Sequence, residues 1–302
     1  MKISIVTPAY NMERWIAETI ESVISQEGDF TIEYIVIDDG SKDRTATIAR
    51  EYEKKISSKQ YPIKCKGVTF QYHLQQNGGA IVAMNNGFSK ASGDIATWVD
   101  ADNTFDPGAF QAMKKVFTAY PGTQWVKGIT STIGEKSELL RAGNCKLYRQ
   151  DWLSLGIYGQ EAYFVEADSV FFTMDLWKKS GPIPSHYRSA GDYWLWIEMA
   201  KHSPLLSLNK HISNFRKREG QLSKGISRYK GEQNNARPVR SAKAWKARLF
   251  FSPQSRITKI FPKLEPAFVA LYPLFFGRPN EQYVESADGK LTMKQFKSYK
   301  IL

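Results

Sequence analysis

Cysteine, histidine and long apolar runs are scarce in this sequence of 302 residues. The two cysteines, Cys65 and Cys145, lie far apart and have no metal-ligand spacing, which argues against a disulfide scaffold and favours a reducing compartment. No window approaches the roughly 20 apolar residues of a membrane span, and the apolar run after Met1 is too short for a signal peptide. A lone histidine is more often a surface residue than a catalyst, so neither His186 nor His202 is assigned a role.

Two glycine-rich phosphate-binding patterns are also missing. No Gly-x-Gly-x-x-Gly fingerprint follows the first strand-like segment, and no Gly-Lys-Ser/Thr loop is present, which argues against dehydrogenases and P-loop ATPases. What the chain does have is a hydrophobic content of 42% and an aromatic content of 13%, which are sufficient for a packed core. Global disorder is therefore not expected.

The charge is unevenly distributed along the chain. Residues 1–200 carry 21 Lys and Arg against 24 Asp and Glu, whereas residues 201–302 carry 21 against 6, so the formal net charge of +12 arises from the last third. Aromatic residues such as Trp245, Phe250 and Phe251 lie among these basic residues, and a strongly apolar segment follows at 264–277. This composition suits the surface of an anionic membrane, with a C-terminal helix packed on the core as an equal alternative.

Strand-like and helix-like segments alternate in the first part of the chain. The predicted strands are Ile3–Thr7, Tyr34–Ile37, Val68–Leu74 and Ile95–Val99, and the predicted helices are Met12–Gln26, Asp43–Lys54, Ala80–Ala91 and Pro107–Phe117. Ser41 is the predicted N-cap of the second helix. This order predicts an α/β fold with a mostly parallel sheet and helices on both faces.

Polar clusters follow the predicted strands at the point where each strand ends. Asp100 and Asp102 come directly after the fourth strand, with one small residue between them. Because ligands of open α/β sheets lie outside the carboxyl ends of the strands, we expect this pair to meet the clusters at residues 7–11 and 38–41. Two carboxylates on a short turn suit Mg²⁺ or Mn²⁺, which take further ligands from substrate phosphates; a solvated acidic turn is the alternative.

Six short segments follow one another along about the first 220 residues. They are Ser4-Ile5-Val6-Thr7-Pro8-Ala9-Tyr10-Asn11, Ile37-Asp38-Asp39-Gly40-Ser41-Lys42-Asp43-Arg44-Thr45, Asn77-Gly78-Gly79, Ala91-Ser92-Gly93-Asp94, Asp100-Ala101-Asp102 and Gly191-Asp192-Tyr193-Trp194-Leu195-Trp196. In this order the segments resemble the nucleotide-sugar glycosyltransferases of family 2, which have a GT-A-type, Rossmann-like fold and mostly invert the anomeric centre.

The resemblance implies that the first two motifs hold the nucleoside of a sugar nucleotide. Pro8, Tyr10 and Asn11 belong to the first motif, with Tyr10 as the aromatic face for the base. Asp39 is implied as the acceptor of a base N–H, while Asp38 either binds the ribose or caps the loop.

The resemblance also implies that Gly79, Asp100 and Asp102 belong to the donor site. Gly79 ends a predicted tight turn that either lets the backbone approach the donor or only shapes the start of the third helix. Asp102 is implied as the direct metal ligand, and Asp100 lies nearer the ribose or reaches the metal through water, with Ala101 between them in the same donor-binding loop. The metal, Mn²⁺ or Mg²⁺, would neutralise charge on the leaving diphosphate.

Two positions depart from the family's pattern. In Phe215-Arg216-Lys217-Arg218-Glu219-Gly220-Gln221-Leu222-Ser223, Arg218 stands where the family's Arg-x-His-x-Gly-x-x-Ser segment has histidine. Charged arginine cannot ligate a metal, so Arg218 is assigned to the diphosphate. Met84 stands where the family often has an arginine, so no phosphate contact carries over to it.

Asp192 is the predicted catalytic base. The resemblance implies that one carboxylate takes the proton from the acceptor hydroxyl as it attacks the anomeric carbon. Family members commonly have Glu-Asp at this point, whereas this chain has Gly191 before Asp192, so no helper role carries over. The alternative for Asp192 is an N-cap of the predicted helix Tyr193–Lys201.

The sequence as a whole predicts a metal-dependent inverting hexosyltransferase. Residues 1–223 are the predicted catalytic domain, and residues 224–302 a basic, aromatic-rich helical extension. The expected donor is a nucleotide sugar, and the resemblance implies that its nucleotide is UDP. The expected acceptor is a glycan or a lipid-linked acceptor of surface polysaccharide synthesis, and no nucleic acid partner is expected. The expected location is the cytoplasm, with peripheral contact at the inner face of an anionic membrane. The alternatives are a sugar-phosphate nucleotidyltransferase, whose Gly-rich loop is missing, and a non-enzymatic polyanion-binding protein that uses the basic C-terminus.

Overall fold

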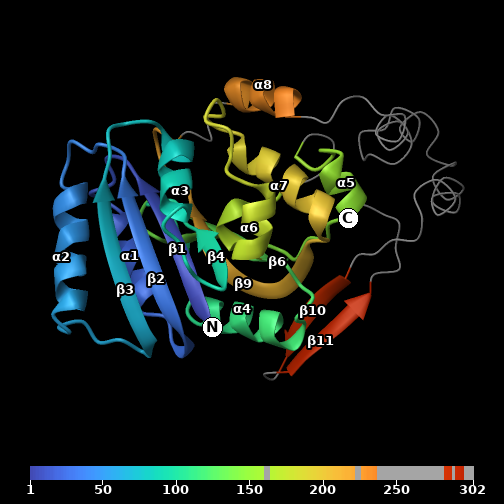
Figure 1. Cartoon of the computed structure of the whole chain (residues 1–302), viewed down its shortest axis with the longest axis horizontal. Helices are drawn as coiled ribbons and strands as arrows, with labels where there is room; N and C mark the ends of the chain where they lie inside the picture. Colours follow the sequence, from blue (N-terminus) through green and yellow to red (C-terminus); the bar gives the residue numbers. More distant parts are fainter. Residues whose placement is uncertain (160–163, 222–225, 237–281, 288–289, 296–302) are drawn as a thin grey trace, which may run out of the picture.

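The computed structural model describes residues 1–159, 164–221, 226–236, 282–287 and 290–295 (Figure 1). The strands are β1 (Lys2–Ala9), β2 (Gly28–Asp38), β3 (Cys65–Leu74), β4 (Ile95–Trp98), β5 (Thr104–Phe105), β6 (Trp125–Ile133), β7 (Leu139–Arg141), β8 (Val170–Thr173), β9 (Leu206–Arg216), β10 (Gln282–Ala287) and β11 (Lys290–Gln295). The helices are α1 (Ile16–Ile24), α2 (Thr45–Ser57), α3 (Ala80–Phe88), α4 (Ala109–Ala119), α5 (Gln150–Ser154), the 3₁₀ turn η1 (Ala167–Ser169), α6 (Met174–Ser180), α7 (Gly191–His202) and α8 (Ile226–Ala236).

The described strands form one sheet in the order β11-β10-β9-β6-β8-β4-β1-β2-β3, with β5 beside β9 and β7 beside β6. β1 pairs in parallel with β2 and β4, and β2 pairs in parallel with β3. β8 is antiparallel to both β4 and β6, whereas β9 pairs in parallel with β6 on one side and with β10 on the other. The short strands β5 and β7 and the last strand β11 pair antiparallel with their neighbours. The mostly parallel sheet predicted from the sequence is therefore confirmed.

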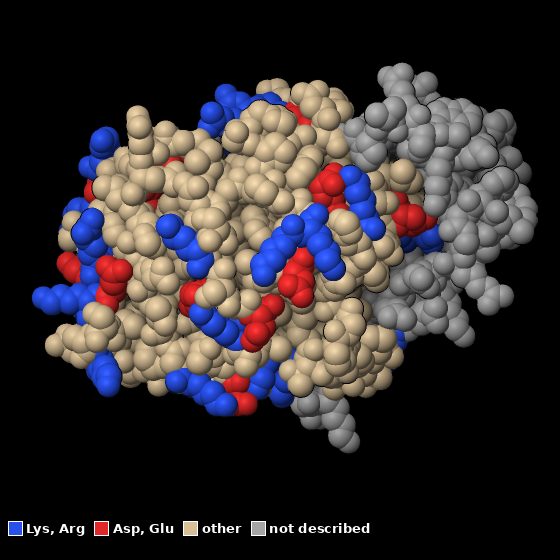
Figure 2. Space-filling model, viewed as in Figure 1, with Lys and Arg blue, Asp and Glu red and all other residues tan. Residues whose placement is uncertain are grey.

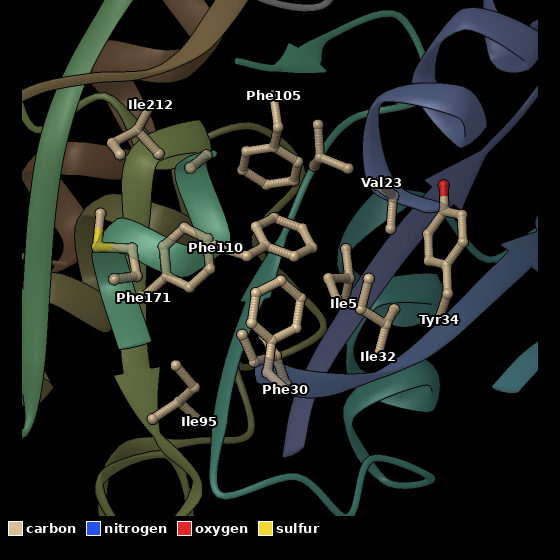
Figure 3. Packing of buried hydrophobic residues seen from close by; sticks show 14 of the residues in the cluster. Ile5, Val23, Phe30, Ile32, Tyr34, Ile95, Phe105, Phe110, Phe171 and Ile212 are labelled. Carbon is tan, nitrogen blue, oxygen red and sulfur yellow. The ribbon is translucent and has the colours of Figure 1, made fainter. Parts of the chain in front are cut away.

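Helices cover both faces of this sheet. Ile3 and Ile5 of β1 pack in the core cluster that also contains α1 and α4, whereas Val6 packs in the second cluster with α3, α6 and α7. Alternation along one strand thus assigns each helix to a face. In the first cluster, Phe105 and Phe110 pack with their ring centroids 5.0 Å apart, and both contact Phe171 (Figure 3).

Most of the predicted helix starts differ from those in the structure by two to four residues. α1 begins at Ile16, four residues later than predicted, with Trp15 in the N-cap position. The predicted N-cap Ser41 is wrong, because α2 begins at Thr45. Ser41 Oγ instead accepts a hydrogen bond from the backbone N–H of Asn11 at 2.9 Å. The loop after β1 is therefore fastened to the loop after β2.

The C-terminal part is packed on the catalytic domain where it is described. α8 contacts α7, and β10 pairs with β9 through Tyr283–Glu285, with Val284 fully buried. Two strands here differ from the purely helical extension predicted. The basic stretch at 237–263 and the apolar segment at 264–277 lie outside the described residues. No helix within the described ranges has the length and apolar character to span a membrane.

Candidate active site

The carboxyl ends of β1, β2 and β4 meet at a cavity of about 530 Å³, here called the first cavity. Parallel strands bring these ends to one edge of the sheet. Predicted site residues that line it are Pro8, Tyr10, Asn11, Asp39, Gly79, Asp100, Ala101, Asp102 and Arg218. The predicted convergence of the three polar clusters is therefore present in the structure.

Asp39 has its carboxylate fixed by the turn before α3. Oδ1 accepts hydrogen bonds from the backbone N–H of Gly78 and from Nε2 of Gln75, and Oδ2 accepts from the backbone N–H of Gly79, each at 2.8 Å. Gly79 has a φ of 93°, which glycine adopts without strain. Asp39 therefore holds a rigid turn while lining the first cavity, which Tyr10 lines with 46% of its surface exposed.

Asp38 does not line the first cavity. Its side chain is fully buried, with Oδ1 accepting a hydrogen bond from the backbone N–H of Ser41 at 2.8 Å and Oδ2 accepting from the Tyr72 hydroxyl at 2.7 Å. Both oxygens are thus engaged within the protein. The geometry supports the alternative in which Asp38 caps the loop and does not bind the ribose.

Asp102 and Arg218 form an ion pair beside the first cavity. Arg218 Nε donates to Asp102 Oδ2 at 2.5 Å, and the guanidinium carbon lies 4.9 Å from the centre of the Trp15 ring. Arg218 therefore compensates the charge of a predicted metal ligand as well as lining the cavity. Cation–π contact with Trp15 further restricts the guanidinium.

Arg216 supports the site from a position that was not predicted from the sequence. Its fully buried guanidinium donates to the carbonyl oxygens of Asp102 and Gly134 at 2.7 and 3.0 Å and to Glu18 Oε2 at 2.6 Å, and its backbone N–H donates to Asn103 Oδ1. These bonds fix the position of residues 100–102, here called the acidic loop. The available signal was its position in the matched segment Phe215–Ser223, where it stands at the family's arginine.

A second cavity of about 410 Å³ adjoins the first. The two share the lining residues Pro8, Ala80, Asp100 and Phe215. Asp192, Asp168, Glu166, Arg188, Phe164 and Tyr229 are further residues that line the second cavity. Asp100 therefore faces both spaces, and the predicted base lies in the second.

Asp192 lies in the first turn of α7, whose N-cap is Ala190. Its Oδ1 accepts a hydrogen bond from the backbone N–H of Tyr193 at 2.7 Å, so the predicted alternative of an N-cap role does not match the geometry. Burial raises the pKa of Asp192 to about 7, helped by the charge of Asp168 and opposed by the Tyr193 hydrogen bond. A carboxylate with this pKa is suited to accept a proton near neutral pH.

Asp168 is a second carboxylate that the sequence analysis missed, because it lies in η1 with no motif around it. It accepts a hydrogen bond from Nδ2 of Asn103 at 2.8 Å, and burial together with the charge of Asp102 raises its pKa to about 6. Asp100 is exposed to solvent and lines both cavities. Partial burial of its carboxyl group, together with the charges of Asp168 and Asp102, raises the pKa of Asp100 well above its usual range. Three carboxyl groups with raised pKa values, those of Asp100, Asp168 and Asp192, therefore line the second cavity.

α8 forms one wall of the second cavity, although it follows the segment of family resemblance. Tyr229 lines the cavity and packs against Phe164 with ring centroids 5.7 Å apart. The Glu232 carboxylate accepts hydrogen bonds from the backbone N–H groups of residues 188–190, at 2.8 to 3.1 Å. The start of α7 is thereby held by α8.

The acidic loop suits a divalent cation that shares its ligands with a substrate. Within the described ranges, no group of three His, Cys, Asp or Glu side chains is arranged to hold a metal. Asp100 and Asp102 line the same cavity, and Mg²⁺ is commonly held by one or two carboxylates together with substrate phosphates. The donor set therefore fits the predicted Mn²⁺ or Mg²⁺.

A comparison with models of known protein families shows which family the chain belongs to. The model described as glycosyl transferase family 2 matches residues 4–159, which is more than half of the chain. The chain belongs to glycosyl transferase family 2. The predicted glycosyltransferase is confirmed, which disfavours the nucleotidyltransferase and polyanion-binding alternatives. The family match ends before Asp192, Arg188 and Arg218, so the second half of the site lies outside it.

Curated relatives of this glycosyltransferase come from several bacteria. It is 25% identical to an uncharacterized glycosyltransferase of Rickettsia typhi over 203 residues, 67% of this chain and 59% of the relative. It is 33% identical to the minor teichoic acid biosynthesis protein GgaB of Bacillus subtilis over 115 residues, 38% of this chain and 12% of the relative. The chain thus spans less than two thirds of the length of these relatives.

A solved structure supports the fold of this glycosyltransferase. The crystal structure of S. aureus TarS 1-349 in complex with UDP-GlcNAc is similar to it with a TM-score of 0.56 and 18% identity, covering 91% of this chain and 80% of that one. At this identity the likeness concerns the fold alone. The predicted GT-A-type fold is therefore confirmed.

Proposed function

We propose that this glycosyltransferase is a metal-dependent, inverting hexosyltransferase that uses a UDP-linked sugar. The observation that carries the proposal is the pair of joined cavities, with the acidic loop lining the first and Asp192 lining the second. The donor nucleotide occupies the first cavity between Tyr10 and Asp39. The TarS complex with UDP-GlcNAc supports a uridine nucleotide as the donor.

The acceptor hydroxyl lies in the second cavity in this proposal. Asp192 takes the hydroxyl proton, while the hydroxyl oxygen forms a bond to the anomeric carbon as the bond from that carbon to the diphosphate breaks. Attack from the face opposite the diphosphate inverts the anomeric centre. A divalent cation held by Asp100 and Asp102 supplies Lewis-acid neutralisation of the leaving diphosphate when it is bound.

The proposed acceptor is a glycan or a lipid-linked glycan of surface polysaccharide synthesis. The similarity to GgaB, whose name assigns it to minor teichoic acid biosynthesis, supports a cell-surface polymer. The paired aromatic rings of Phe164 and Tyr229 give the second cavity an apolar side on which a sugar ring can pack. The corresponding location is the cytoplasm, with peripheral contact at the inner membrane face.

Thermal-shift measurements with UDP test the donor site directly. We expect UDP to raise the melting temperature more in Mn²⁺ or Mg²⁺ than in chelator, because a ligand that binds only the folded state stabilises it. Asp102→Ala should abolish the difference between metal and chelator. Equal stabilisation of the wild type in chelator would count against a metal-bridged diphosphate, and a preference for another base would contradict only the uridine assignment.

A further inference from the structure

Arg188 carries a charge that no side chain of the described part of the molecule compensates. Its Nη1 donates to the carbonyl oxygen of Gly78 at 2.6 Å, and its guanidinium pairs with no carboxylate among the described residues. Arg218, the other arginine lining the two cavities, is paired with Asp102. Arg188 is exposed and lines the second cavity, so its remaining N–H groups are available to a ligand.

The position of Arg188 is specified from two sides. Its backbone N–H and those of the next two residues donate to Glu232 of α8. On the other side, a Cβ added to Gly79 would lie 2.6 Å from Arg188 Nη1, so the guanidinium packs directly on this glycine. Since Gly79 lines the first cavity, Arg188 stands at the border between the two cavities.

The lining of the second cavity near Arg188 is rich in carboxyl groups. Asp100, Asp168 and Asp192 all line the second cavity, and Met84, which also lines it, contributes no charge. Besides the divalent cation proposed at Asp100 and Asp102, a phosphate-bearing substrate placed among these carboxyl groups would meet Arg188 as the cationic side chain in the described lining of the second cavity. The planar guanidinium offers several parallel N–H donors and suits phosphate oxygens.

We propose that Arg188 binds a phosphate group of a substrate. Two sources present this chemistry at the border of the cavities: the diphosphate of the donor and a phosphate carried by the acceptor. The inference rests on the proposed function for its location, but the binding of phosphate by Arg188 can be measured without turnover.

The experiment is a calorimetric titration of the full chain in Mn²⁺ with UDP, with uridine and with glycerol 3-phosphate. Arg188→Ala is compared with Arg188→Lys, which keeps the charge, and with Arg141→Ala, which removes an exposed arginine that lines neither cavity. If the donor diphosphate is the ligand, Arg188→Ala weakens UDP binding about tenfold or more, leaves uridine binding unchanged and is partly rescued by lysine.

The two sources of phosphate separate in the same titrations. Unchanged UDP binding with a loss of glycerol 3-phosphate binding in Arg188→Ala would assign the residue to a phosphate of the acceptor. Unchanged affinity for both phosphate ligands would overturn the proposal, and so would an equal loss in Arg141→Ala. A wild type that binds neither UDP nor uridine would instead contradict the proposed donor, while the glycerol 3-phosphate titration would still decide the role of Arg188.

Discussion

Asp192 is the residue on which the proposed chemistry depends most directly. Asp192→Asn keeps the size of the side chain but cannot accept a proton, so we expect turnover to fall by about 10²-fold or more. UDP affinity should remain unchanged, since Asp192 does not line the first cavity. Turnover is measured with a verified acceptor, and a rate near that of the wild type would remove Asp192 from the mechanism.

The raised pKa of Asp192 predicts the pH dependence of catalysis. A base works in its unprotonated form, and burial raises the pKa of this carboxyl to about 7, so kcat/KM should increase as the pH rises through about 7. The charge of Asp168 contributes to this shift. Asp168→Asn should therefore move the acidic limb of the profile to lower pH, and a limb that stays in place would contradict the assignment.

The raised pKa of Asp192 also predicts that the stability of the folded protein decreases as the pH rises, whereas kcat/KM increases. Because the folded-state pKa of about 7 exceeds the ordinary value of 3.8, protonated Asp192 favours folding, and this stabilisation is lost as the pH rises through about 7. Asp192→Asn removes the cost of burying the charge. We expect the variant to unfold at a higher temperature than the wild type at about pH 8, with a smaller difference at about pH 4, in calorimetric scans.

At this scale the sequence identifies the chemistry but not the direction of each side chain. Asp38 and Asp39 are adjacent, yet one is enclosed by Ser41 and Tyr72 and the other lines the first cavity. Asp38 is the last residue of β2, whereas Asp39 lies in the loop that follows. Asp168 takes its place through tertiary packing and has no motif around it, whereas for Arg216 the one signal in the sequence is its match to the family's arginine.

Between elements, Glu33 links three segments of the parallel sheet. It lies in β2 and accepts bonds from Lys2 and Ser4 of β1 and from Ser92 before β4. Burial acts to raise its pKa, but these partners outweigh burial and lower the pKa from 4.5 to about 2. The charged form is therefore favoured by folding, and its stabilisation is lost as the pH falls from 4.5 towards 2.

Glu33→Gln should destabilise the protein by about 1–3 kcal/mol at neutral pH, because a charged, hydrogen-bonded carboxylate is lost from the sheet. The difference from the wild type should shrink as the pH approaches about 2.5. Urea unfolding at both pH values measures it, with Glu27→Gln as the control, since Glu27 is 69% exposed and pairs only with Lys64 among the described residues. An equal difference at both pH values would contradict the ion-pair origin.

Periodicity predicts the early elements well and the later ones poorly. Up to α4, clear apolar patterns predict most strands and helices within four residues at each end. β2 begins at Gly28, six residues before the predicted start at Tyr34, and the short strand β5 is not predicted. All nine residues of β6 are buried, so the strand does not alternate between buried and exposed positions, and five of the nine are polar or glycine. Ser41 misled the prediction of the α2 start because its hydroxyl serves Asn11, on another loop.

For the molecule as a whole, the distribution of charge points to the C-terminal stretch. On the face shown in Figure 2, Lys and Arg of the described residues are spread out, with Asp and Glu among them. The excess of positive charge lies in residues 201–302, which carry 21 Lys and Arg against 6 Asp and Glu. The proposed contact with an anionic membrane therefore rests on this part of the sequence.

We expect the full chain to sediment with vesicles that contain anionic lipid and not with neutral ones, less strongly as salt rises. Changing the eight Lys and Arg between residues 237 and 263 to Gln should abolish sedimentation and leave UDP binding intact. This variant retains α8 and β10, which pack on α7 and β9. Sedimentation that survives the change would place the membrane contact elsewhere.

The anchoring of the start of α7 by Glu232 of α8 bears on how inhibitors of this enzyme are sought. Every lining residue of the first cavity lies at or before Gln221, whereas Tyr229 belongs to the wall of the second. A shortened protein ending at residue 223 would offer compound libraries the first cavity, proposed to bind the nucleotide, without the complete second cavity, proposed to bind the acceptor. Screens on such a fragment would select nucleotide mimics, which tend to cross-react with other enzymes that use the same nucleotide. Compounds that fill the second cavity, the proposed acceptor site, would be found only with α8 in place.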